Sequence, residues 1–344
     1  MFSTVLQELK GYFSRDFFLT VFFPIMLFTG LSVTLCLEIS YGLRGALAAW
    51  EKLALQTQGI AILCWLVVVT TLSYMVYNYL YAITRLFEGY WTRVPILWRL
   101  RNPRVNLHKQ RWKYLGELAE AAGTVTLANE IIAEQLAYYP PSKHLDKMMP
   151  TLFGNIMRTS EIYAYDRYGI DSTITWTRLR PLLKIEALAA LEDKKISLNF
   201  SILMTFFFAS FSLFWCTTLA AFTTRWGLFL LCAAGWPFAW FSYRNAIQSA
   251  LAYSEQVAAV FDLYRHDLLK ALNRKVPPDI SAERKEWLRL TRFFYRNAPL
   301  SPAPPSPERP DGWERLADVL AGYLERSTTS TPASAAPPTK PDYE

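Results

Sequence analysis

Apolar runs without a charged residue alternate with stretches of mixed polarity along this chain. Four such runs cover residues 17–37, 59–83, 200–222 and 227–243. A helix needs about 20 apolar residues to cross the hydrocarbon layer of a membrane. The first three runs reach this length, and the shorter fourth run is extended by apolar residues that follow Arg244. The pattern therefore predicts four transmembrane helices.

The segments between these runs have the period of a helix and few alternating patterns typical of strands. Residues 84–199 separate the second run from the third and are long enough for a small domain. Within them, residues 113–139 predict one amphipathic helix. Its apolar positions recur at short helical intervals, at Leu115, Leu118, Ala121, Val125, Ile131, Ile132 and Leu136. We therefore expect an all-α domain between the second and third spans.

The helical period continues beyond the fourth run. We expect the fourth helix to extend without a break toward Pro277 and to pack its apolar face on the domain between the second and third spans. A shorter amphipathic helix at 280–297 has Trp287 and Leu290 on its apolar side and arginines on the other. This pattern suits either a helix on the membrane surface or an ordinary packed helix.

Positive charge predicts the orientation of the spans. Twelve Lys and Arg residues flank the ends of the runs on the side that holds the N-terminus, residues 84–199 and the chain after residue 243. Three flank the opposite ends, namely Arg44, Lys52 and Arg225. Because loops rich in Lys and Arg stay in the cytoplasm, we expect both termini and the 84–199 domain to be cytoplasmic.

Composition agrees with a membrane protein. The chain is 52% hydrophobic and 19% charged, which is more apolar than an average soluble domain. Its net charge of +7 comes from basic residues beside helix ends. A groove for nucleic acid would instead combine clustered basic residues with exposed aromatic ones. We therefore expect membrane lipids as partners, and no nucleic acid.

The C-terminal tail differs from the rest of the chain. Ten of the twenty prolines lie from Pro299 onward, a composition typical of disorder. A short amphipathic helix is predicted within it at 311–326, with Trp313, Leu316, Leu320 and Leu324 on one face. We expect this helix to fold on contact with a cytoplasmic protein partner.

These patterns together predict an all-α membrane protein with a cytoplasmic domain formed by the loop between spans two and three and the extension of helix four. The expected segments are a cytoplasmic N-terminal segment (1–16), a first transmembrane hairpin (17–83), a cytoplasmic helical domain (84–199), a second transmembrane hairpin (200–243), a cytoplasmic helical extension (244–298) and the Pro-rich tail (299–344).

A dense group of polar residues lies in the segment PTLFGNIMRTSEIYAYDRYGID, residues 150–171. Pro150 suits a first helical turn, Gly169 the position just past a helix end, and Asp171 the cap of a following helix that begins at residue 172. The candidate functional or docking cluster consists of Asn155, Arg158, Glu161, Tyr165, Asp166, Arg167 and Asp171. Because the first four are three or four positions apart, they are predicted to form one polar stripe.

The cluster has a structural and a functional interpretation. In the structural one, Arg158 and Glu161 pair along the helix, which contributes about 0.2–0.5 kcal/mol, while Asp166 and Arg167 bond nearby backbone ends. In the functional one, the stripe binds a phosphate or headgroup, since an arginine offers two parallel donors to such anions. We interpret the cluster as structural or as a docking surface, in preference to a catalytic site.

Signals for an enzyme are weak. The three histidines, His108, His144 and His266, lie apart without metal-ligand spacing, and each is interpreted as a surface residue. No phosphate-binding loop, metalloprotease or hydrolase motif is present. The four cysteines lie one in each apolar run, where a thiol acts as a small apolar residue. We predict no metal and no cofactor, and a lipid-modifying enzyme that uses Glu161, Asp166 and Asp171 is only a weaker alternative.

Two functional hypotheses remain. Ion-coupled pumps carry ionisable residues within their spans, and the four runs have none. Their polar residues can pack helices or line a passive pore, and they are Asn78, Ser73, Thr70, Thr71, Ser210, Ser212, Thr217 and Thr218. The first hypothesis is an oligomeric passive channel gated by the cytoplasmic helical domain. The alternative is a membrane-anchored scaffold that recruits a cytoplasmic partner.

Two motifs carry a resemblance to a family. The runs GNIMRTSEIYAYDRYGID (154–171) and FDLYRHDLLKAL (261–272) resemble those of an uncharacterised family of bacterial multi-pass membrane proteins, in which a GN-x-x-R element precedes an RYGID element. The resemblance implies a bacterial inner-membrane location. It implies no activity and assigns no role to any residue.

Overall fold

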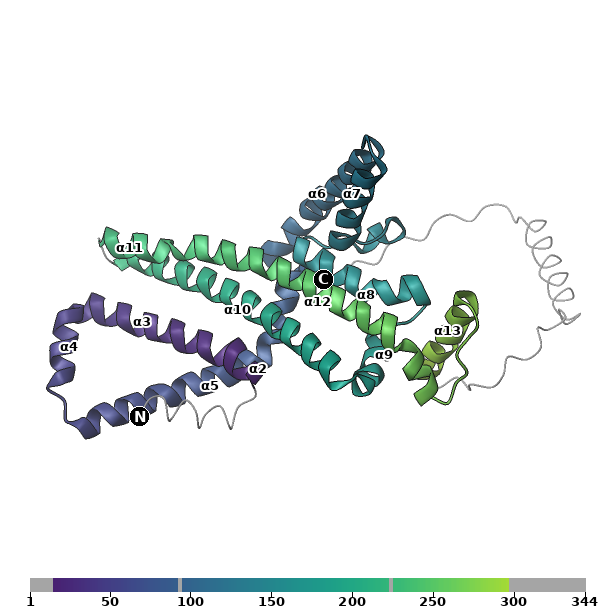
Figure 1. Cartoon of the computed structure of the whole chain (residues 1–344). Coiled ribbons are helices and arrows are strands. Elements are labelled where there is room, and N and C mark those ends of the chain that lie inside the picture. The colour runs from purple at the N-terminus through teal and green to yellow at the C-terminus, as the bar shows by residue number, and fades with distance from the viewer. Residues whose placement is uncertain (1–14, 92–94, 223–224, 297–344) are drawn as a thin grey trace, which may run out of the picture. The chain divides into compact units, whose positions relative to one another are not determined.

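The structure is a computed structural model that describes residues 15–91, 95–222 and 225–296, except for the side chains of residues 95 and 96 (Figure 1). Every regular element in these ranges is a helix. Contacts divide the chain into two compact units, residues 1–291 and residues 292–344. The predicted Pro-rich tail and its helix at 311–326 lie outside the described residues.

Three of the four apolar runs lie in helices that are long and apolar enough to cross a membrane, which is compatible with those three predicted spans. They are Arg15–Tyr41, which comprises α2 (Arg15–Phe17), the π-helical turn η1 (Phe18–Phe22) and α3 (Phe23–Tyr41), together with α5 (Leu55–Glu88) and α10 (Ile185–Phe222). The short helix α4 (Leu43–Glu51) connects α3 to α5. The π-helical turn precedes Pro24, which has no N–H to donate to the carbonyl of Thr20.

The fourth apolar run differs from the single helix predicted for residues 227–243. It is divided at Ala234 into α11 (Trp226–Ala233) and the start of α12 (Gly235–Ala271). Pro237 cannot donate to the carbonyl four residues earlier, so the helical ladder is interrupted here. Gly235 also approaches α10 closely, since a Cβ at this position would lie 2.0 Å from Ser212 Oγ. A glycine and a proline only two positions apart, Gly235 and Pro237, are therefore the feature of the sequence that indicates the division.

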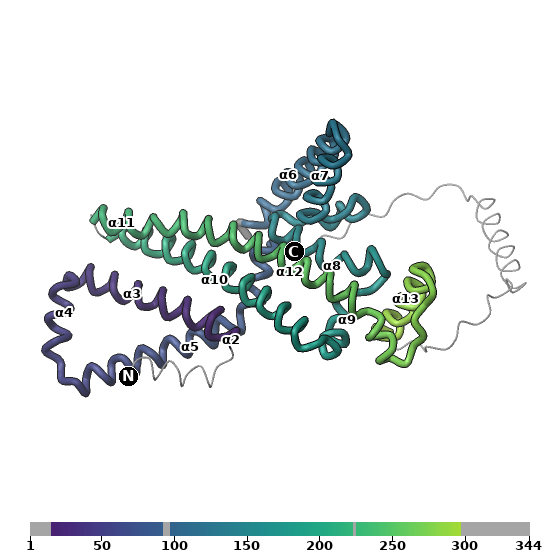
Figure 2. Tube along the Cα trace, viewed as in Figure 1, coloured from purple at the N-terminus to yellow at the C-terminus, as the bar shows by residue number. Residues whose placement is uncertain are grey.

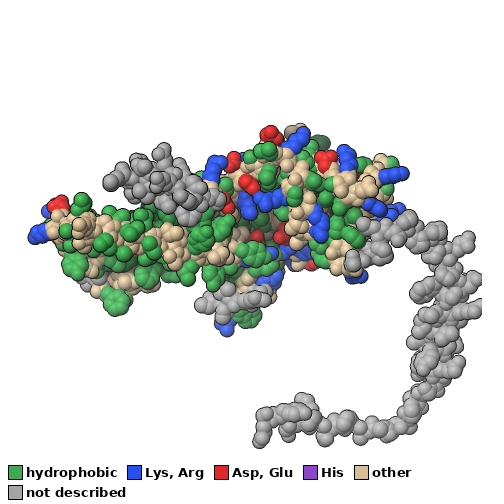
Figure 3. Space-filling model, turned by 90° about the horizontal axis from the view of Figure 1, so that it is seen from below, with side chains coloured by type: hydrophobic (Ala, Val, Ile, Leu, Met, Phe, Trp, Pro, Cys, Tyr) green, Lys and Arg blue, Asp and Glu red, His purple; other side chains and the backbone are tan. Residues whose placement is uncertain are grey.

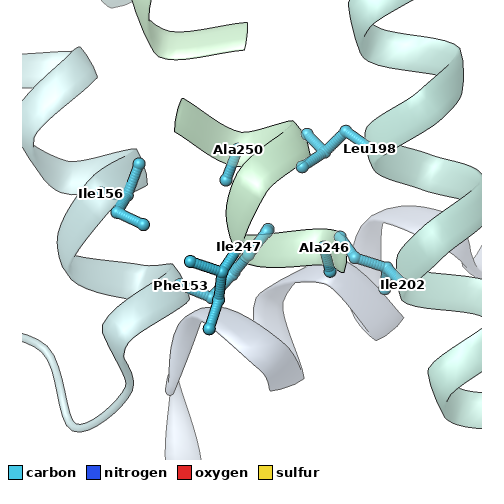
Figure 4. Packing of buried hydrophobic residues seen from close by; sticks show 7 residues of the cluster. All are labelled: Phe153, Ile156, Leu198, Ile202, Ala246, Ile247 and Ala250. Atoms are coloured by element: carbon cyan, nitrogen blue, oxygen red, sulfur yellow. The ribbon is translucent and has the colours of Figure 1, made fainter. Parts of the chain in front are cut away.

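Helix α12 continues without interruption to Ala271, close to the predicted limit at Pro277. It runs beside α10, as the tube in Figure 2 shows, and packs on α8 (Leu152–Tyr168). The central core joins these three helices (Figure 4). Its buried members are Phe153 and Ile156 of α8, Leu198 and Ile202 of α10, and Ala246, Ile247 and Ala250 of α12. The predicted packing of the fourth helix on the domain between spans two and three is thus confirmed.

The domain between α5 and α10 is helical, but its boundaries differ from the prediction. The expected helix at 113–139 is two helices, α6 (Pro95–Glu120) and α7 (Val125–Tyr138), because Thr124 leaves the helical conformation and its hydroxyl caps α7. Leu115 and Ile131 of the predicted apolar face are buried in the core between α6 and α7. The remaining large apolar members of that face, Leu118, Val125, Ile132 and Leu136, are exposed.

The short helices that follow have clear local causes. The 3₁₀ turn η3 (Ser142–Lys147) connects α7 to α8. After α8, the predicted continuous helix from residue 172 is divided into α9 (Ser172–Leu179), the 3₁₀ turn η4 (Arg180–Leu182) and α10. Pro181 explains this division, since it cannot donate within a helix interior. Helix α13 (Ile280–Arg296) forms as predicted, and Trp287 and Leu290 are buried in the protein, as in an ordinary packed helix.

Side-chain types are segregated within the first unit. On the face in Figure 3, hydrophobic side chains cover the part that holds α3 and α10, and charged side chains gather over the part that holds α8 and α13. This separation agrees with long helices in an apolar environment and shorter ones in water.

Candidate functional site

Helix α8 carries most of the predicted cluster, and its first turn is joined to the last turn of α5. The Thr151 hydroxyl donates to the carbonyl of Phe87 at 2.7 Å and accepts from the Gly154 N–H at 2.9 Å. The one hydroxyl thus both caps the start of α8 and provides a donor to a carbonyl in the last turn of α5, which has no partner within its own helix. The approach requires Gly154, because a Cβ there would lie 1.9 Å from the carbonyl oxygen of Glu88.

Asn155 is fully buried beneath this junction. Its Oδ1 accepts from the Met149 N–H at 2.7 Å, and its Nδ2 donates to the carbonyls of Met149 and Thr151, each at 3.0 Å. The side chain fixes the loop that leads into α8. Among the predicted cluster residues, Asn155 therefore has a structural position and does not line an open surface.

Arg158 and Glu161 form the ion pair expected from their spacing, with Nη1 and Oε2 2.7 Å apart. Arg158 also donates to the Tyr90 hydroxyl at 2.6 Å. Arg85 of α5 lies over the ring of Tyr90, 4.3 Å from its centroid, and pairs with Glu88 at 3.2 Å. These five side chains, which we call the arginine cluster, join the end of α5 to the middle of α8 with two positive and two negative charges.

Asp166 faces the opposite direction, toward η3. Its Oδ1 lies 2.8 Å from His144 Nε2 and 3.0 Å from Lys143 Nζ. His144 is only 14% exposed and is not the surface residue expected from the sequence. The Asp166 Oδ2 atom is buried without a hydrogen-bond partner among the described residues. The carboxylate therefore holds η3 against α8.

The C-terminal half of α8 meets α12 in a second network. The hydroxyls of Tyr163 and Tyr168 donate to the two carboxylate oxygens of Asp262, at 2.8 Å and 2.7 Å. Arg167 donates to the Tyr163 hydroxyl, and Arg265 lies over the ring of Tyr168, 4.1 Å from its centroid. We call these five residues the tyrosine network. It replaces the bonds to nearby backbone ends that the sequence suggested for the Arg167 side chain.

The tyrosine network changes the acidity of both phenols. Burial and the hydrogen bond to Asp262 raise the pKa of Tyr168 to about 12, although the charge of Arg265 lowers it. Burial, followed by the hydrogen bond to Asp262, also raises the pKa of Tyr163. Both phenols therefore remain protonated donors at neutral pH, as two hydrogen bonds to a single carboxylate require.

Helix α13 extends this network with a buried carboxylate. Glu283 is 4% exposed and accepts from Arg265 Nε at 2.9 Å and from Trp287 Nε1 at 3.2 Å. Arg284 donates to the backbone carbonyls of Asp166 and Arg167 at the end of α8. A cation at this position also interacts favourably with the helix dipole. The carbonyls at the end of α8 thus bond to an arginine that lies far away in the sequence.

The remaining cluster residues do not join these groups. Tyr165 is 49% exposed on α8. Asp171 accepts from the N–H groups of Thr173 and Ile174, which confirms that it caps the next helix. Gly169, with φ of +75°, ends α8 as predicted. The predicted stripe therefore does not act as one surface. Asn155 is buried and bonds the backbone, Arg158 and Glu161 form an ion pair, and the Tyr165 ring is exposed.

Several important residues were missed by the sequence analysis. Glu88 and Tyr90 lie in a segment that it did not single out, and no local pattern marks them as partners of α8. Glu283 lies in the predicted helix at 280–297, where only the apolar side and the arginines were considered. Asp262 and Arg265 belong to the second of the two motifs that carried the resemblance. Their contacts with Tyr168 show that the two motifs meet in space. In the sequence the two motifs are separate runs, and nothing in either run indicates that they are in contact.

The charged residues of this site pair with one another and with the backbone. No group of His, Cys, Asp and Glu within the described ranges could hold a metal ion. Glu161, Asp166 and Asp171, the residues of the enzyme hypothesis, have three different sets of partners and do not converge. A cavity of about 290 Å³ lies beside Glu161, between α8, α9 and α12, with Trp176 and Phe261 in its wall. We call it the α8–α9 pocket.

No protein-family model matches the chain, and no curated protein or solved structure is significantly similar to it.

Proposed function

We propose that this chain is a multi-pass membrane scaffold that holds a rigid helical platform in the cytoplasm for a protein partner. The platform consists of α8, α9, α13 and the part of α12 from Ala246 onward. Three long apolar helices are compatible with a membrane protein. The proposal concerns what those helices carry.

The topology that we propose has four crossings. Helix α11 and the first turns of α12 are packed along α10 and form the fourth crossing, despite the division at Ala234. Both termini and residues 84–199 then lie on the cytoplasmic side of a bacterial inner membrane, as the distribution of Lys and Arg favours. Helices α10 and α12 pass from apolar to polar sequence at the same level, since Leu198 and Ala246 belong to one core.

The observation that carries the scaffold proposal is the way α8 is fixed. The arginine cluster attaches it to α5, the tyrosine network to α12, and Arg284 to α13. The charged residues are thus used to hold a helix in place, and the α8–α9 pocket beside them remains open. A surface whose side chains are already oriented binds a partner without a large loss of conformational entropy.

Capture of a partner tests this proposal. The full-length chain is cross-linked in membranes and purified, and its retained proteins are compared with those of Trp176→Ala, which removes a wall of the pocket. Thr177→Ala, an exposed neighbour on α9 that does not line the pocket, is the control. We expect one partner to be lost from Trp176→Ala alone. Equal capture by all three chains would contradict the assignment of the pocket.

Arg158→Ala provides a second test, because it removes the contact of α8 with Tyr90. We expect normal insertion into the membrane, as the apolar helices are unchanged, together with loss of partner capture. Normal capture by this variant would show that the position of α8 does not matter for docking. The predicted partner helix at 311–326 can be deleted in the same assay to separate docking on the platform from docking on the tail.

The oligomeric channel is a second candidate, and one observation favours it. Large apolar side chains of α5 are exposed, including Ile60 and Leu63, each at 62%, and Val67 at 58%. Such a face is available to lipid or to other copies of the chain. However, the seven hydroxyls predicted as pore-lining groups all donate to main-chain carbonyls, six of them within their own helix. Ion flux in liposomes that contain only the purified chain would favour the channel over the scaffold.

A further inference from the structure

A second cavity lies where the ends of several helices meet. Its volume is about 570 Å³, and its walls come from the last turn of α5, from α6, from the start of α8 and from α12. Phe87 and Trp91 line it on one side, Arg104 and His108 of α6 on another, and Trp240 and Arg244 of α12 on a third. It is distinct from the α8–α9 pocket, with which it shares no lining residue.

The cavity lies at the border between apolar and polar sequence. Phe87 packs against the central core that includes Ile202 and Ala246. The apolar run of α5 ends at Ile83, and Arg244 is the first charged residue after the apolar run of α11 and α12. The headgroups of a bilayer occupy this level when the apolar runs span its hydrocarbon layer.

The charge of the cavity is positive. Arg104 and Arg244 line it, and none of the described residues in its wall is an Asp or Glu. Neither arginine forms an ion pair with a described residue, whereas Arg85 and Arg158 nearby both do. Burial lowers the pKa of His108, and the charge of Arg104 lowers it further. Among the described residues of the wall, the two guanidinium groups are therefore the cations that an anion would meet.

The rest of the wall is apolar and aromatic. Trp91 lines the cavity, and its indole N–H donates to the Leu86 carbonyl at 2.8 Å, which holds the ring against the end of α5. The guanidinium of Arg244 lies 5.5 Å from the ring centre of Trp240, which is 55% exposed. Trp and Tyr rings are enriched at the headgroup level of membranes, and arginine forms paired hydrogen bonds with phosphates. A molecule with an anionic head and an apolar body matches this wall.

We propose that this cavity binds the headgroup phosphate of an anionic phospholipid from the surrounding bilayer, with Arg104 and Arg244 as its charge partners. The glycerol region and the first methylene groups contact Phe87, Trp91 and Trp240. The lipid bridges α6 and α12, which carry one arginine each. This site goes beyond the scaffold function and requires no protein partner.

Thermal unfolding of the purified full-length chain in detergent tests the site. We expect added phosphatidylglycerol to raise the unfolding temperature in a saturable manner, and phosphatidylcholine to have a much smaller effect. In the double variant Arg104→Gln/Arg244→Gln, the apparent affinity for phosphatidylglycerol should fall at least about tenfold, because both charge-assisted contacts are removed. Both arginines are exposed, so the unfolding temperature without lipid should change little.

Two controls distinguish a built site from general attraction. Arg99→Gln removes an exposed arginine of α6 that does not line the cavity, and it should bind phosphatidylglycerol like the wild type. Arg104→Lys/Arg244→Lys retains the charges and should recover much of the affinity even if the glutamine variant folds poorly. An equal loss in Arg99→Gln would overturn the proposal, as would equal stabilisation of the wild type by both lipids.

The source of the phosphate is tested separately. Glycerol 3-phosphate carries the same anionic group without acyl chains, and we expect it neither to stabilise the chain nor to displace phosphatidylglycerol at equal concentration. Displacement would identify the ligand as a soluble phosphate ester and overturn the assignment to a membrane lipid. Partner capture by Trp176→Ala is unaffected by any of these outcomes, so failure of the lipid site and failure of the scaffold proposal can be recognised independently.

Discussion

The Tyr168 hydroxyl donates a 2.7 Å hydrogen bond to Asp262, which lies 94 residues later in the chain. Tyr168 is buried at the end of α8, and Asp262 is partly buried on α12. The same carboxylate accepts from Tyr163, five residues earlier on α8. A single acidic side chain therefore sets the rotation of α8 on α12.

Removing one of these hydroxyls should destabilise the fold. Hydrogen bonds to charged groups contribute about 1.5–3 kcal/mol, so we expect Tyr168→Phe to lower the free energy of unfolding by an amount in this range. Tyr165→Phe is the matched control, since the Tyr165 ring is exposed on the same helix. Thermal unfolding followed by circular dichroism should show a lower midpoint for Tyr168→Phe only. Equal midpoints would mean that the bond to Asp262 adds no stability.

The same network predicts a loss of stability in alkali. An unfolded tyrosine ionises with a pKa of about 10, whereas Tyr168 in the folded chain retains its proton up to about 12. Between these two values, unfolding releases a proton, so stability is complete below the first and is lost as pH rises through the second. Unfolding midpoints measured from pH 9 to pH 12 should fall less steeply in Tyr168→Phe than in the wild type.

His108 predicts the opposite dependence, on the acid side. Burial, with a further contribution from the charge of Arg104, lowers the pKa of His108 in the folded chain. The unfolded chain therefore binds a proton first, at about pH 6.5, and stability is lost as pH falls below this value. We expect the midpoint of His108→Gln to depend less on pH than that of the wild type between pH 7 and pH 5. Parallel curves would show that His108 does not titrate against folding.

The junction between α5 and α8 should not accept a side chain at Gly154. A Cβ there would lie 1.9 Å from the Glu88 carbonyl oxygen, which is backbone and cannot rotate away. We expect Gly154→Ala to lower the free energy of unfolding by about 1–3 kcal/mol or more through overpacking. Gly116→Ala is the control on α6, where the nearest atom lies at an ordinary 3.6 Å, and a helical alanine should stabilise slightly. Expression level and unfolding midpoint measure both variants.

The sequence predicted those helices and helix ends that depend on residues close together in the chain. The three long apolar helices follow from charge-free runs, the end of α8 from Gly169, and the cap of α9 from Asp171. The divisions at Thr124 and Pro181 were missed although their signals are also local, because the apolar period was followed across them.

The contents of the candidate site could not be predicted in the same way. Helical spacing places Asn155, Arg158 and Tyr165 on one face of a helix, but it does not say which edge of that face is buried. The contacts of Asp262 and Glu283 with α8 and α12 join segments that are distant in sequence. Such pairings depend on how the helices pack, and the spacing of residues along one helix does not identify the helix that packs on it.

The unbroken course of α12 past Ala246 makes it a lever. From there to Ala271 it measures about 38 Å at about 1.5 Å per residue, and no proline or glycine interrupts it. A rigid rod of that length that tilts by about 10° moves its far end by about 7 Å. In the four-crossing topology that we propose, a tilt of the apolar start of α12 in the bilayer is therefore enlarged into a displacement of the far end of that helix.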